Sequence, residues 1–249
     1  MGYCHDPGCD SPHDHCLEAV TVCVGFDDLL DIALDRNHPH LDTAIIVTSH
    51  EDSKTKLVAK KHGAILVETD LFTKNGLVFN KGAAINAGFH RFQYRGWRMH
   101  LDSDIILPDN FRRMLFNHTH LEPSHIYGCD RVNVVGVNEL RRMEARGPQH
   151  HFSFMVGSRA ERVQGHRYLD MLEGYLPIGC FQMWHADAQK PYPYSLGEAA
   201  HSDIMFAAQW PRDCRTLLPS VICYHLCTRP PKHGENWSGV RQMPRLPDL

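Results

Sequence analysis

A regular alternation of apolar strands and amphipathic helices runs through the first hundred residues and constrains the fold more than any other feature. Short β-branched runs such as AVTVCVGF (19–26) and TAIIVTS (43–49) are typical of strands buried on both faces. Segments with leucines at helical spacing, such as DDLLDIALDRN (27–37), separate them. This alternation predicts an α/β fold with a parallel sheet covered on both sides. The expected strands are 19–26, 43–49, 64–70 and 98–107, and the expected helices are 27–37, 51–63 and 79–92.

The chain divides by composition into an arm and a body. Residues 1–18 are polar and rich in Cys, His, Asp and Pro, so we expect an irregular N-terminal arm. Residues 19–110 carry the alternation and are typical of a nucleotide-binding α/β half. Residues 111–249 follow a looser pattern that ends in a Pro-rich tail. No sharp linker separates the two halves, which favours a single domain.

Bulk composition argues against several classes of protein. The net charge of −3 disfavours a broad basic surface for nucleic acid or anionic membrane. No apolar run approaches the roughly 20 residues that cross a bilayer, and the start MGYCHDPGCD has no signal-peptide core. We therefore expect a cytoplasmic protein with no membrane partner. In that compartment nine cysteines, an odd number, indicate thiols or metal ligands rather than a disulfide framework.

Two aspartates interrupt an otherwise apolar strand in RMHLDSDIIL (98–107). If this segment is one strand, Asp102 and Asp104 lie at its carboxyl end and on the same side of the pleat, because they are two residues apart. Ligands of open parallel sheets collect at that end. Adjacent carboxylates repel unless a cation lies between them, which predicts a divalent ion with oxygen ligands. The alternative is a single aspartate that caps a turn before Pro108.

The motifs around these aspartates resemble those of a GT-A glycosyltransferase of the family 2 kind. The resemblance covers roughly residues 20–239 and rests on TVCVGFDD, IIVTSHEDSKT, FNKGAAINAGF, LDSDIILP, PIGCFQMWHA, HSDIMFAAQW and YHL. It implies a GT-A, Rossmann-like fold with a mostly parallel central sheet flanked by helices. It also implies that the aspartates hold Mn²⁺ or Mg²⁺, and that the metal holds the diphosphate of a nucleotide sugar. Asp102 would face ribose or metal, and Asp104 would be the firmer ligand. The compact chain also resembles virus-encoded transferases.

The same resemblance implies further metal-binding and donor-binding residues. His225 follows the last strand, where this fold often supplies a third metal ligand, and imidazole suits Mn²⁺ better than Mg²⁺. A core or turn histidine is the alternative. In the loop TSHEDSKT, Glu51 and Asp52 are candidates to contact the base of a UDP-sugar, unless both simply lie at a helix N-terminus. The rest of the donor pocket would be Phe26, Asp27 and Lys81, with Lys81 pairing with phosphate or with Asp102, or remaining on the solvated surface.

Residues 111–249 would then form the acceptor-binding half and the C-terminal tail. An inverting transferase needs a base that takes the proton of the attacking hydroxyl. Asp203 lies where the family's Glu-Asp pair usually ends and is our candidate, although His201-Ser202 replaces the expected acid beside it. An N-cap role for Asp203 is the alternative. In PIGCFQMWHA, an acceptor wall with aromatic faces for sugar C–H groups is expected, unless these residues belong to the core: Gly179, Phe181 and Trp184.

Cysteine and histidine residues crowd the arm and recur around the last strand. A structural zinc ion that joins arm and tail is one hypothesis, because zinc prefers four thiolate and imidazole ligands. The spacing matches no standard zinc finger, and a flexible arm is the alternative. The candidate ligands are Cys4, Cys9, His13, His15, Cys16, Cys223 and Cys227.

We therefore expect a metal-dependent glycosyltransferase that moves a sugar from a nucleotide-sugar donor to a hydroxyl acceptor, with inversion. A nucleotidyltransferase shares the sheet and the acidic site, but it predicts a Gly-rich phosphate loop that VCVGFDDLLD lacks. A noncatalytic binding module would not need the metal pair, the histidine and the late aspartate together. A further alternative is a glycosyltransferase acting on modified bases in DNA, for which a basic rim would come from Arg112, Arg113, Arg141, Arg142 and Arg146.

Overall fold

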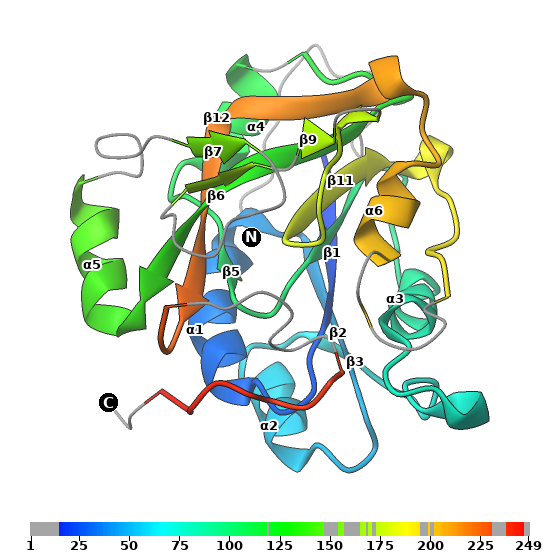
Figure 1. Cartoon of the computed structure of the whole chain (residues 1–249), viewed down its shortest axis with the longest axis vertical. Helices are drawn as coiled ribbons and strands as arrows, with labels where there is room; N and C mark the ends of the chain where they lie inside the picture. The colour runs from blue at the N-terminus through cyan, green and yellow to red at the C-terminus, as the bar shows by residue number, and fades with distance from the viewer. Residues whose placement is uncertain are drawn as a thin grey trace.

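A computed structural model gives the fold of the chain (Figure 1). It describes residues 15–118, 120–146, 154–156, 165–167, 169–170, 173–194, 199, 202–230 and 238–246. No helix among these residues is both long and apolar enough to cross a bilayer.

Four parallel strands form the first half of the sheet, as the alternation predicts. They are β1 (Leu17–Val22), β2 (Thr43–Thr48), β3 (Ile65–Glu68) and β4 (Trp97–Leu101). They pair in the order β3-β2-β1-β4, with Val20 of β1 opposite Ile45 of β2. Every residue of β1 and β2 is buried, which explains why both read as continuous apolar and β-branched runs.

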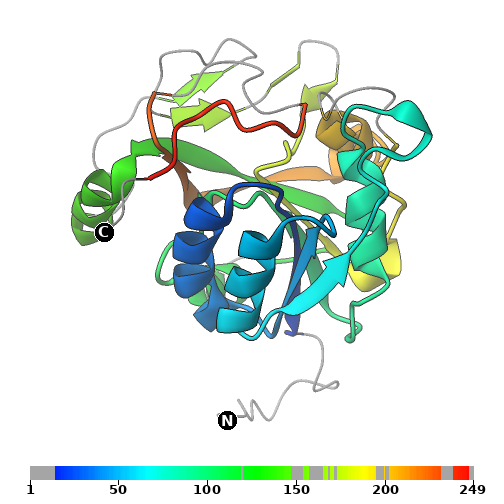
Figure 2. The same ribbon diagram turned by 90° about the horizontal axis from the view of Figure 1, so that it is seen from below.

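Helices cover both faces of this half. The connections are α1 (Asp27–Asn37), α2 (Ser53–Lys61) and α3 (Lys81–Phe89). Side chains of β2 alternate between the faces: Ala44 and Ile46 share a core cluster with α1 and α2, whereas Ile45 and Val47 share one with α3. Figure 2 shows α1 and α2 side by side, with α3 apart from them.

The second half continues the same sheet with mixed strand directions. Its strands are β5 (Ile105–Ile106), β6 (Ile126–Val135), β7 (Phe154–Val156), β8 (Gly165–Arg167), β11 (Phe181–His185) and β12 (Arg215–Cys227). Antiparallel β11 lies between β4 and β6, β12 runs parallel to β6, and β5 pairs antiparallel with β12 at the edge. Strand β8 pairs with β6 and β7, and β9 (Leu169–Asp170) forms a separate pair with β10 (Gly174–Tyr175). One sheet therefore runs through both halves, which confirms the predicted single α/β domain.

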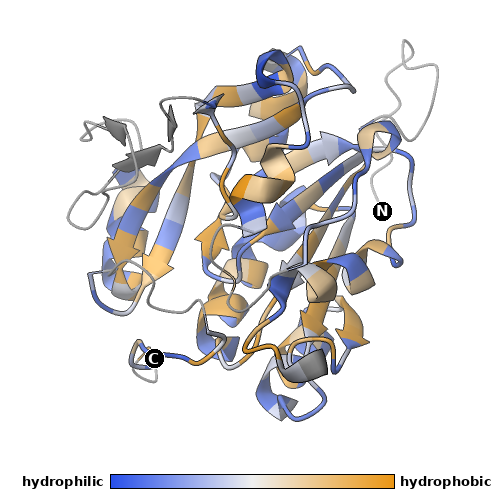
Figure 3. Cartoon of the chain, turned by 45° about the vertical axis from the view of Figure 1, so that its right-hand side comes forward, coloured by the Kyte–Doolittle hydropathy of each residue, from blue (hydrophilic) through white to orange (hydrophobic). Residues whose placement is uncertain are grey.

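The remaining helices complete the two layers. They are α4 (Phe111–His118), α5 (Gly136–Arg146) and α6 (Ser202–Ala207), with 3-10 turns η1 (His38–His40), η2 (Lys74–Gly76), η4 (Ala186–Ala188) and η5 (Arg212–Cys214). Helix α5 shares its core cluster with α1, and α6 shares its cluster with α3. Figure 3 shows apolar residues recurring along the strands and in the helices packed on them.

The segment 98–107 is not one strand. Strand β4 ends at Leu101, a turn follows, and β5 pairs with β12 instead of continuing beside β1. Asn37, the last residue of α1, fixes this break: its Nδ2 donates to the Ile105 carbonyl at 2.8 Å, and its Oδ1 accepts from Leu107 N at 2.8 Å. The prediction that Asp102 and Asp104 share one face of a pleat was therefore wrong, because the chain turns between them.

Candidate functional site

The turn after β4 lies at the carboxyl edge of the sheet, between β11 and β12. Its backbone is tied to both neighbours, because Asp102 N donates to the Cys180 carbonyl at 3.4 Å and Leu226 N donates to the Asp104 carbonyl at 2.8 Å. Ile105 N closes the turn on the Asp102 carbonyl at 3.2 Å. Strands β1, β4, β6 and β12 all end on this side. Ligands of open α/β sheets bind at such an edge.

Asp104 and His225 form a largely buried pair at this turn. Nε2 of His225 lies 3.3 Å from Oδ2 of Asp104, and the side chains are 15% and 14% exposed. Nδ1 of the same ring lies 2.7 Å from Oδ1 of Asn133 on β6. Burial alone would lower the pKa of His225, but its neighbours Cys227 and Asp104 raise it to about 10. Burial would raise the pKa of Asp104, but His225 and Arg131 hold it below its ordinary value. Each member of the pair therefore favours the charged form of the other.

Asp102 pairs with Lys81, as one of the sequence hypotheses anticipates. Nζ of Lys81 hydrogen-bonds Oδ1 of Asp102, and both side chains are partly buried. Lys81 is the first residue of α3, whose N-cap Asn80 accepts a hydrogen bond from Ala83 N at 3.0 Å. Burial alone would lower the pKa of Lys81, but Asp102, and then Asp203 and Asp104, raise it. The helix start thus delivers a charged ammonium to the aspartates.

The turn offers some, but not all, of the ligand atoms that a hard divalent cation needs. Oδ1 of Asp104 is buried and accepts no hydrogen bond from any described residue, so it is available to a ligand. Carboxylate oxygens and an imidazole nitrogen are ligands that Mn²⁺ accepts. Asp102 is engaged by Lys81, and no three His, Cys, Asp or Glu side chains within the described ranges are grouped to hold a metal. Ions of this kind are often held by one or two carboxylates together with substrate phosphates, which fits such a partial protein set.

Asp203 lies in the first turn of α6 with both carboxylate oxygens engaged. Oδ2 accepts from Gly179 N at 2.5 Å, and Oδ1 accepts from Ile204 N at 2.9 Å. A Cβ on Gly179 would lie 3.0 Å from Oδ2, so the glycine permits this close approach. Burial raises the pKa of Tyr192, and the charges of Asp203 and Asp102 raise it further. The carboxylates of Asp203 and Asp102 therefore both lie near Tyr192 and Lys81. Helix α6 thus places Asp203 at the site.

The aromatic residues expected at the acceptor lie in the core instead. Phe181 and Trp184 are both fully buried. Phe181 packs edge-on against Phe111 of α4 at 5.8 Å, and Trp184 packs edge-on against Phe206 of α6 at 5.0 Å. A strand inside a sheet that is covered on both faces buries its side chains in both directions. Neither ring therefore offers a face to an acceptor sugar. Phe181 and Trp184 are core residues, which was the alternative interpretation of the sequence.

The loop after β1 and the start of α2 meet at the same edge. Oδ1 of Asp52 accepts from Thr55 N at 3.0 Å, which makes Asp52 the N-cap of α2. Its Oδ2 accepts from Thr55 Oγ1 and from Gly25 N, each at 2.7 Å. The structure thus gives Asp52 the N-terminal role that was the alternative to base contact, and Glu51 is exposed beside it. The other candidates of this pocket are buried at the start of α1: Phe26 and Asp27.

Comparison with known proteins was informative only at the level of structure. No protein-family model matches the sequence, and no curated protein matches it. The fold resembles the crystal structure of a mycobacterial protein, with a TM-score of 0.53 and 15% identity over 88% of this chain and 69% of that one. It also resembles glucosyl-3-phosphoglycerate synthase from Mycobacterium tuberculosis in complex with Mn²⁺, UDP-glucose and phosphoglyceric acid. That match has a TM-score of 0.51 and 15% identity over 84% of this chain and 71% of the synthase. The chain has the GT-A fold.

A second type of GT-A synthase matches over a shorter stretch. Mannosyl-3-phosphoglycerate synthase from Rubrobacter xylanophilus is 16% identical with a TM-score of 0.39, over 47% of this chain and 40% of the synthase. The chain thus spans less than half the length of that relative. At 15% identity, the likeness to the two structures with TM-scores above 0.5 is one of fold alone.

The proposed zinc ligands do not meet in the described part of this GT-A chain. Cys4, Cys9 and His13 lie outside the described residues. His15 and Cys16 precede β1 at the amino edge of the sheet, whereas Cys227 ends β12 at the carboxyl edge. Cys223 lies between, with its Sγ 3.3 Å from Sγ of Cys129 as two free thiols. The sheet itself separates the four described candidates, so they cannot share one ion.

Arg131 of β6 is a residue of the candidate site that the sequence analysis missed. Burial alone would lower its pKa, but the neighbouring Cys180, Asp104 and Asp102 raise it. Its Nε is buried and has no hydrogen-bond partner in the described part of the chain. Such a guanidinium suits a phosphate or carboxylate ligand. The signal was present in IYGCDRVNVV, where charged residues interrupt an apolar strand as they do in LDSDII.

Proposed function

We propose that the protein is a metal-dependent glycosyltransferase that transfers a sugar from a UDP-sugar to a hydroxyl acceptor. The observation that carries this proposal is the largely buried Asp104 and His225 pair, with a buried carboxylate oxygen that has no partner among the described residues. The Lys81 and Asp102 pair lies beside it at the carboxyl edge of the sheet. A synthase of the same fold is complexed with Mn²⁺, UDP-glucose and phosphoglyceric acid, which supports the class of donor and metal.

The residues at the turn divide the work of donor binding. Asp104, His225 and Asp102 would hold Mn²⁺ or Mg²⁺. The bound metal stabilises the negative charge that develops on the departing diphosphate. Lys81 would pair with a phosphate oxygen of the donor.

Asp203 is the proposed base for the acceptor hydroxyl. Its carboxylate is held by the backbone of Gly179 and Ile204, so its orientation is fixed before the acceptor arrives. It takes the hydroxyl proton as the oxygen attacks the anomeric carbon from the face opposite the diphosphate. The product therefore has the inverted configuration. Replacing Asp203 by Asn keeps the shape and an acceptor atom for Gly179 N, and it should abolish transfer while leaving UDP binding intact.

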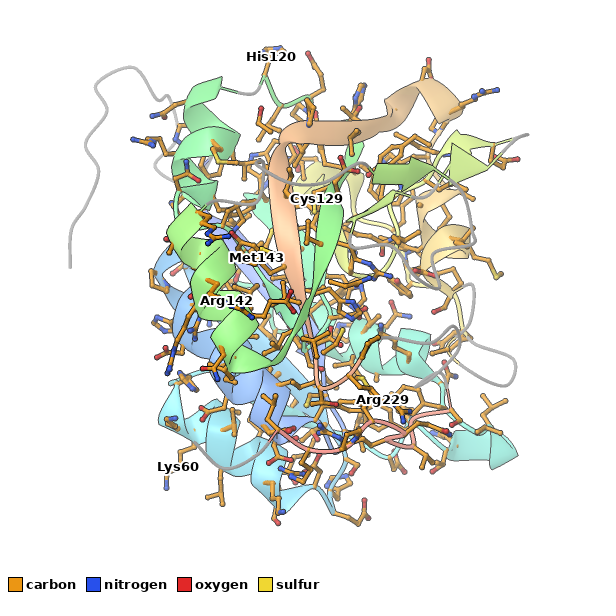
Figure 4. All side chains as sticks on the ribbon, turned by 60° about the vertical axis from the view of Figure 1, so that its left-hand side comes forward. Lys60, His120, Cys129, Arg142, Met143 and Arg229 are labelled. Carbon is orange, nitrogen blue, oxygen red and sulfur yellow. The ribbon has the colours of Figure 1, made fainter. Side chains whose placement is uncertain are left out.

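Charge near the site favours a small anionic acceptor over DNA. Arg131 has an Nε without a partner in the described residues, close to the aspartates, and it suits an acceptor of the phosphoglyceric acid type. Arg112, by contrast, donates to Asp42 Oδ2 and to the His15 carbonyl, each at 2.8 Å, at the amino edge. Arg142 projects from α5 on the flank of the molecule (Figure 4). No observation gathers these arginines into a DNA-binding rim at the site.

The proposal is tested by thermal shift with UDP and UDP-sugars, with and without Mn²⁺. A ligand that binds only the folded state raises the melting temperature by mass action. We expect a shift that requires both nucleotide and metal, and that is absent in D104N. A sugar that gives the shift is then supplied with hydroxy acids and phosphorylated hydroxy acids, and release of UDP is measured. A wild-type protein that shows no metal-dependent shift with any UDP compound would overturn the proposal.

A further inference from the structure

Residues 238–246 lie across the carboxyl edge of the first half of the sheet. Figures 1 and 2 show this segment, drawn in red, passing over the loop after β1 and the start of α1. Gly239, at φ +71°, brings its backbone so close to Phe79 that a Cβ would overlap the aromatic ring. Met243 is buried, and Leu246 packs on the cluster around α1. The segment is therefore packed onto the edge where the candidate donor residues lie.

Arg241 anchors this segment to α1. Its Nη1 and Nη2 donate to the two carboxylate oxygens of Asp28 at 2.5 and 2.9 Å. Its Nε donates to the Met243 carbonyl at 2.9 Å, and its guanidinium carbon lies 4.8 Å from the centre of the Phe26 ring. The Arg241 side chain is only 12% exposed. Paired charge-assisted bonds of this kind fix geometry as well as adding stability.

Arg241 also holds the loop between β1 and α1. Its Nη1 donates to the Gly25 carbonyl at 3.1 Å, while Gly25 N donates to Asp52 Oδ2 at 2.7 Å from the opposite side. Both polar groups of Gly25 are thus occupied, at a residue whose φ of +75° favours glycine. The next residues, Phe26 and Asp27, are those that the donor pocket would use.

One carboxylate oxygen of Asp27 has no hydrogen-bond donor among the described residues. Its Oδ2 accepts from Arg245, on the same segment, whose side chain is 43% exposed. Its Oδ1 is buried and accepts no hydrogen bond from any residue in the described ranges. A buried acceptor without a partner is costly, and an N–H of a nucleobase or an O–H of a ribose would satisfy it.

We propose that Arg241 is a positioning residue for the nucleotide donor, and that residues 238–246 form one wall of the donor pocket. This inference rests on the proposed function. Arg241 fixes Gly25 to Asp28, so that Oδ1 of Asp27 faces the nucleoside. Loss of that constraint weakens donor binding more than it slows the chemical step, because Arg241 acts on the pocket and not on the reacting atoms.

The test compares R241A with R241K, D28N and the double variant R241A/D28N. The probe is UDP with Mn²⁺, measured by titration calorimetry below the unfolding temperature of every variant. We expect R241A to weaken UDP binding about 10- to 100-fold, since small misplacements of a pocket have effects of this size. R241K should restore part of the affinity. The effects of R241A and D28N should not add, because the two residues form one unit.

The matched control is R36A. Arg36 also belongs to an ion pair on α1, with its Nε 2.5 Å from Oε1 of Glu144, but it lies at the other end of the helix. R36A should lose stability without losing UDP affinity. Hydrogen exchange at Gly25 and Phe26 should rise in R241A and not in R36A.

Two outcomes would separate the two proposals. Wild-type protein that binds UDP with Mn²⁺, together with an R241A that binds equally well, would overturn the role of Arg241 alone. A wild type that does not bind UDP would overturn the proposed function and this inference together. Equal losses of affinity in R241A and R36A would show a general effect on stability and would also overturn the positioning role.

Discussion

Oδ2 of Asp104 lies 3.3 Å from Nε2 of His225. Backbone hydrogen bonds hold the two residues near each other, in addition to the attraction between their side chains. Leu226 N donates to the Asp104 carbonyl at 2.8 Å, so the residue after His225 is tied to the turn itself. His225 also pairs in register with Ile105, the residue after Asp104. The two candidate ligands are therefore held together by strand pairing whether or not a metal is present.

Because of this preorganisation, conservative changes at the pair should remove metal dependence without unfolding the protein. D104N and H225N should each lower sugar transfer about 100-fold or more, since the metal supplies several kcal/mol of charge stabilisation. Manganese-dependent shifts of the melting temperature with UDP should disappear. The control is D35N, at a carboxylate that is 73% exposed on α1. Retention of the metal-dependent shift in D104N would contradict the assignment of this ligand.

Asn37 is expected to be worth more to stability than an ordinary surface asparagine. Both of its hydrogen bonds go to buried backbone groups of the β5 region, at 2.8 Å each. N37A leaves a carbonyl and an N–H without partners, so the free energy of unfolding should fall by about 2 to 4 kcal/mol. Urea denaturation measures this change. N138A, at an exposed position of α5, should change stability little, and an equal loss there would contradict the explanation.

The first half of the fold was predictable because its central strands β1 and β2 are buried on both faces. Continuous apolar runs that alternate with helical periodicity fit few arrangements other than buried parallel strands joined by helices. The expected helix 27–37 coincides with α1. The break between β4 and β5 was not predictable in the same way. The pattern of polar and apolar residues in LDSDIIL does not show where the strand stops. The chain turns after β4 because Asn37 bonds the Ile105 carbonyl and β5 pairs with β12. Local sequence does not encode such partners.

The site was partly predictable for a related reason. Charged residues inside apolar runs marked Asp102 and Asp104, and the same signal in IYGCDRVNVV marked Arg131 but was not used. The aromatic residues of PIGCFQMWHA were ambiguous, because a ring that stacks on sugar and a ring that fills a core have the same composition. Only the position of β11 between two covered strands decides that Phe181 and Trp184 are buried.

Acid should destabilise the protein in part through Asp28. Burial alone would raise the pKa of this carboxyl, but Arg241 and the Leu246 N–H hold it below its ordinary value of 3.8. The unfolded state then binds more protons, so the stability that Asp28 contributes is present near neutral pH and is lost as the pH falls below about 4. We expect D28N to be less stable than wild type at pH 7 and to lose less stability between about pH 5 and about pH 3. Chemical denaturation across that range measures both slopes, and parallel slopes would contradict the role of Asp28.

Gln182 is expected to control the position of Asp203. Its Nε2 donates to the Pro177 carbonyl at 2.8 Å and to the Asp203 carbonyl at 2.9 Å, and its Oε1 accepts from Tyr192 Oη at 2.9 Å. Q182L removes the hydrogen bond to the Pro177 carbonyl and one of the hydrogen bonds to the Asp203 carbonyl in a buried setting, so α6 should shift and stability should fall by about 1 to 3 kcal/mol. Transfer should slow while UDP binding with Mn²⁺ persists, because Asp203 belongs to the acceptor step and not to the donor pocket.

Two further variants separate a shift of Asp203 from a loss of stability. Y192F removes one hydrogen bond of Gln182 but leaves both of its contacts to backbone carbonyls, so it should cost about 1 kcal/mol and slow transfer only slightly. Q209A removes a hydrogen bond from Nε2 to the Pro191 carbonyl at 3.0 Å on the exposed side of the same region. It should leave kcat unchanged. If Q182L keeps the wild-type kcat at a temperature where it is folded, the hydrogen bonds from Gln182 to the two carbonyls do not position Asp203. In that case the substitution lowers only the stability of the protein.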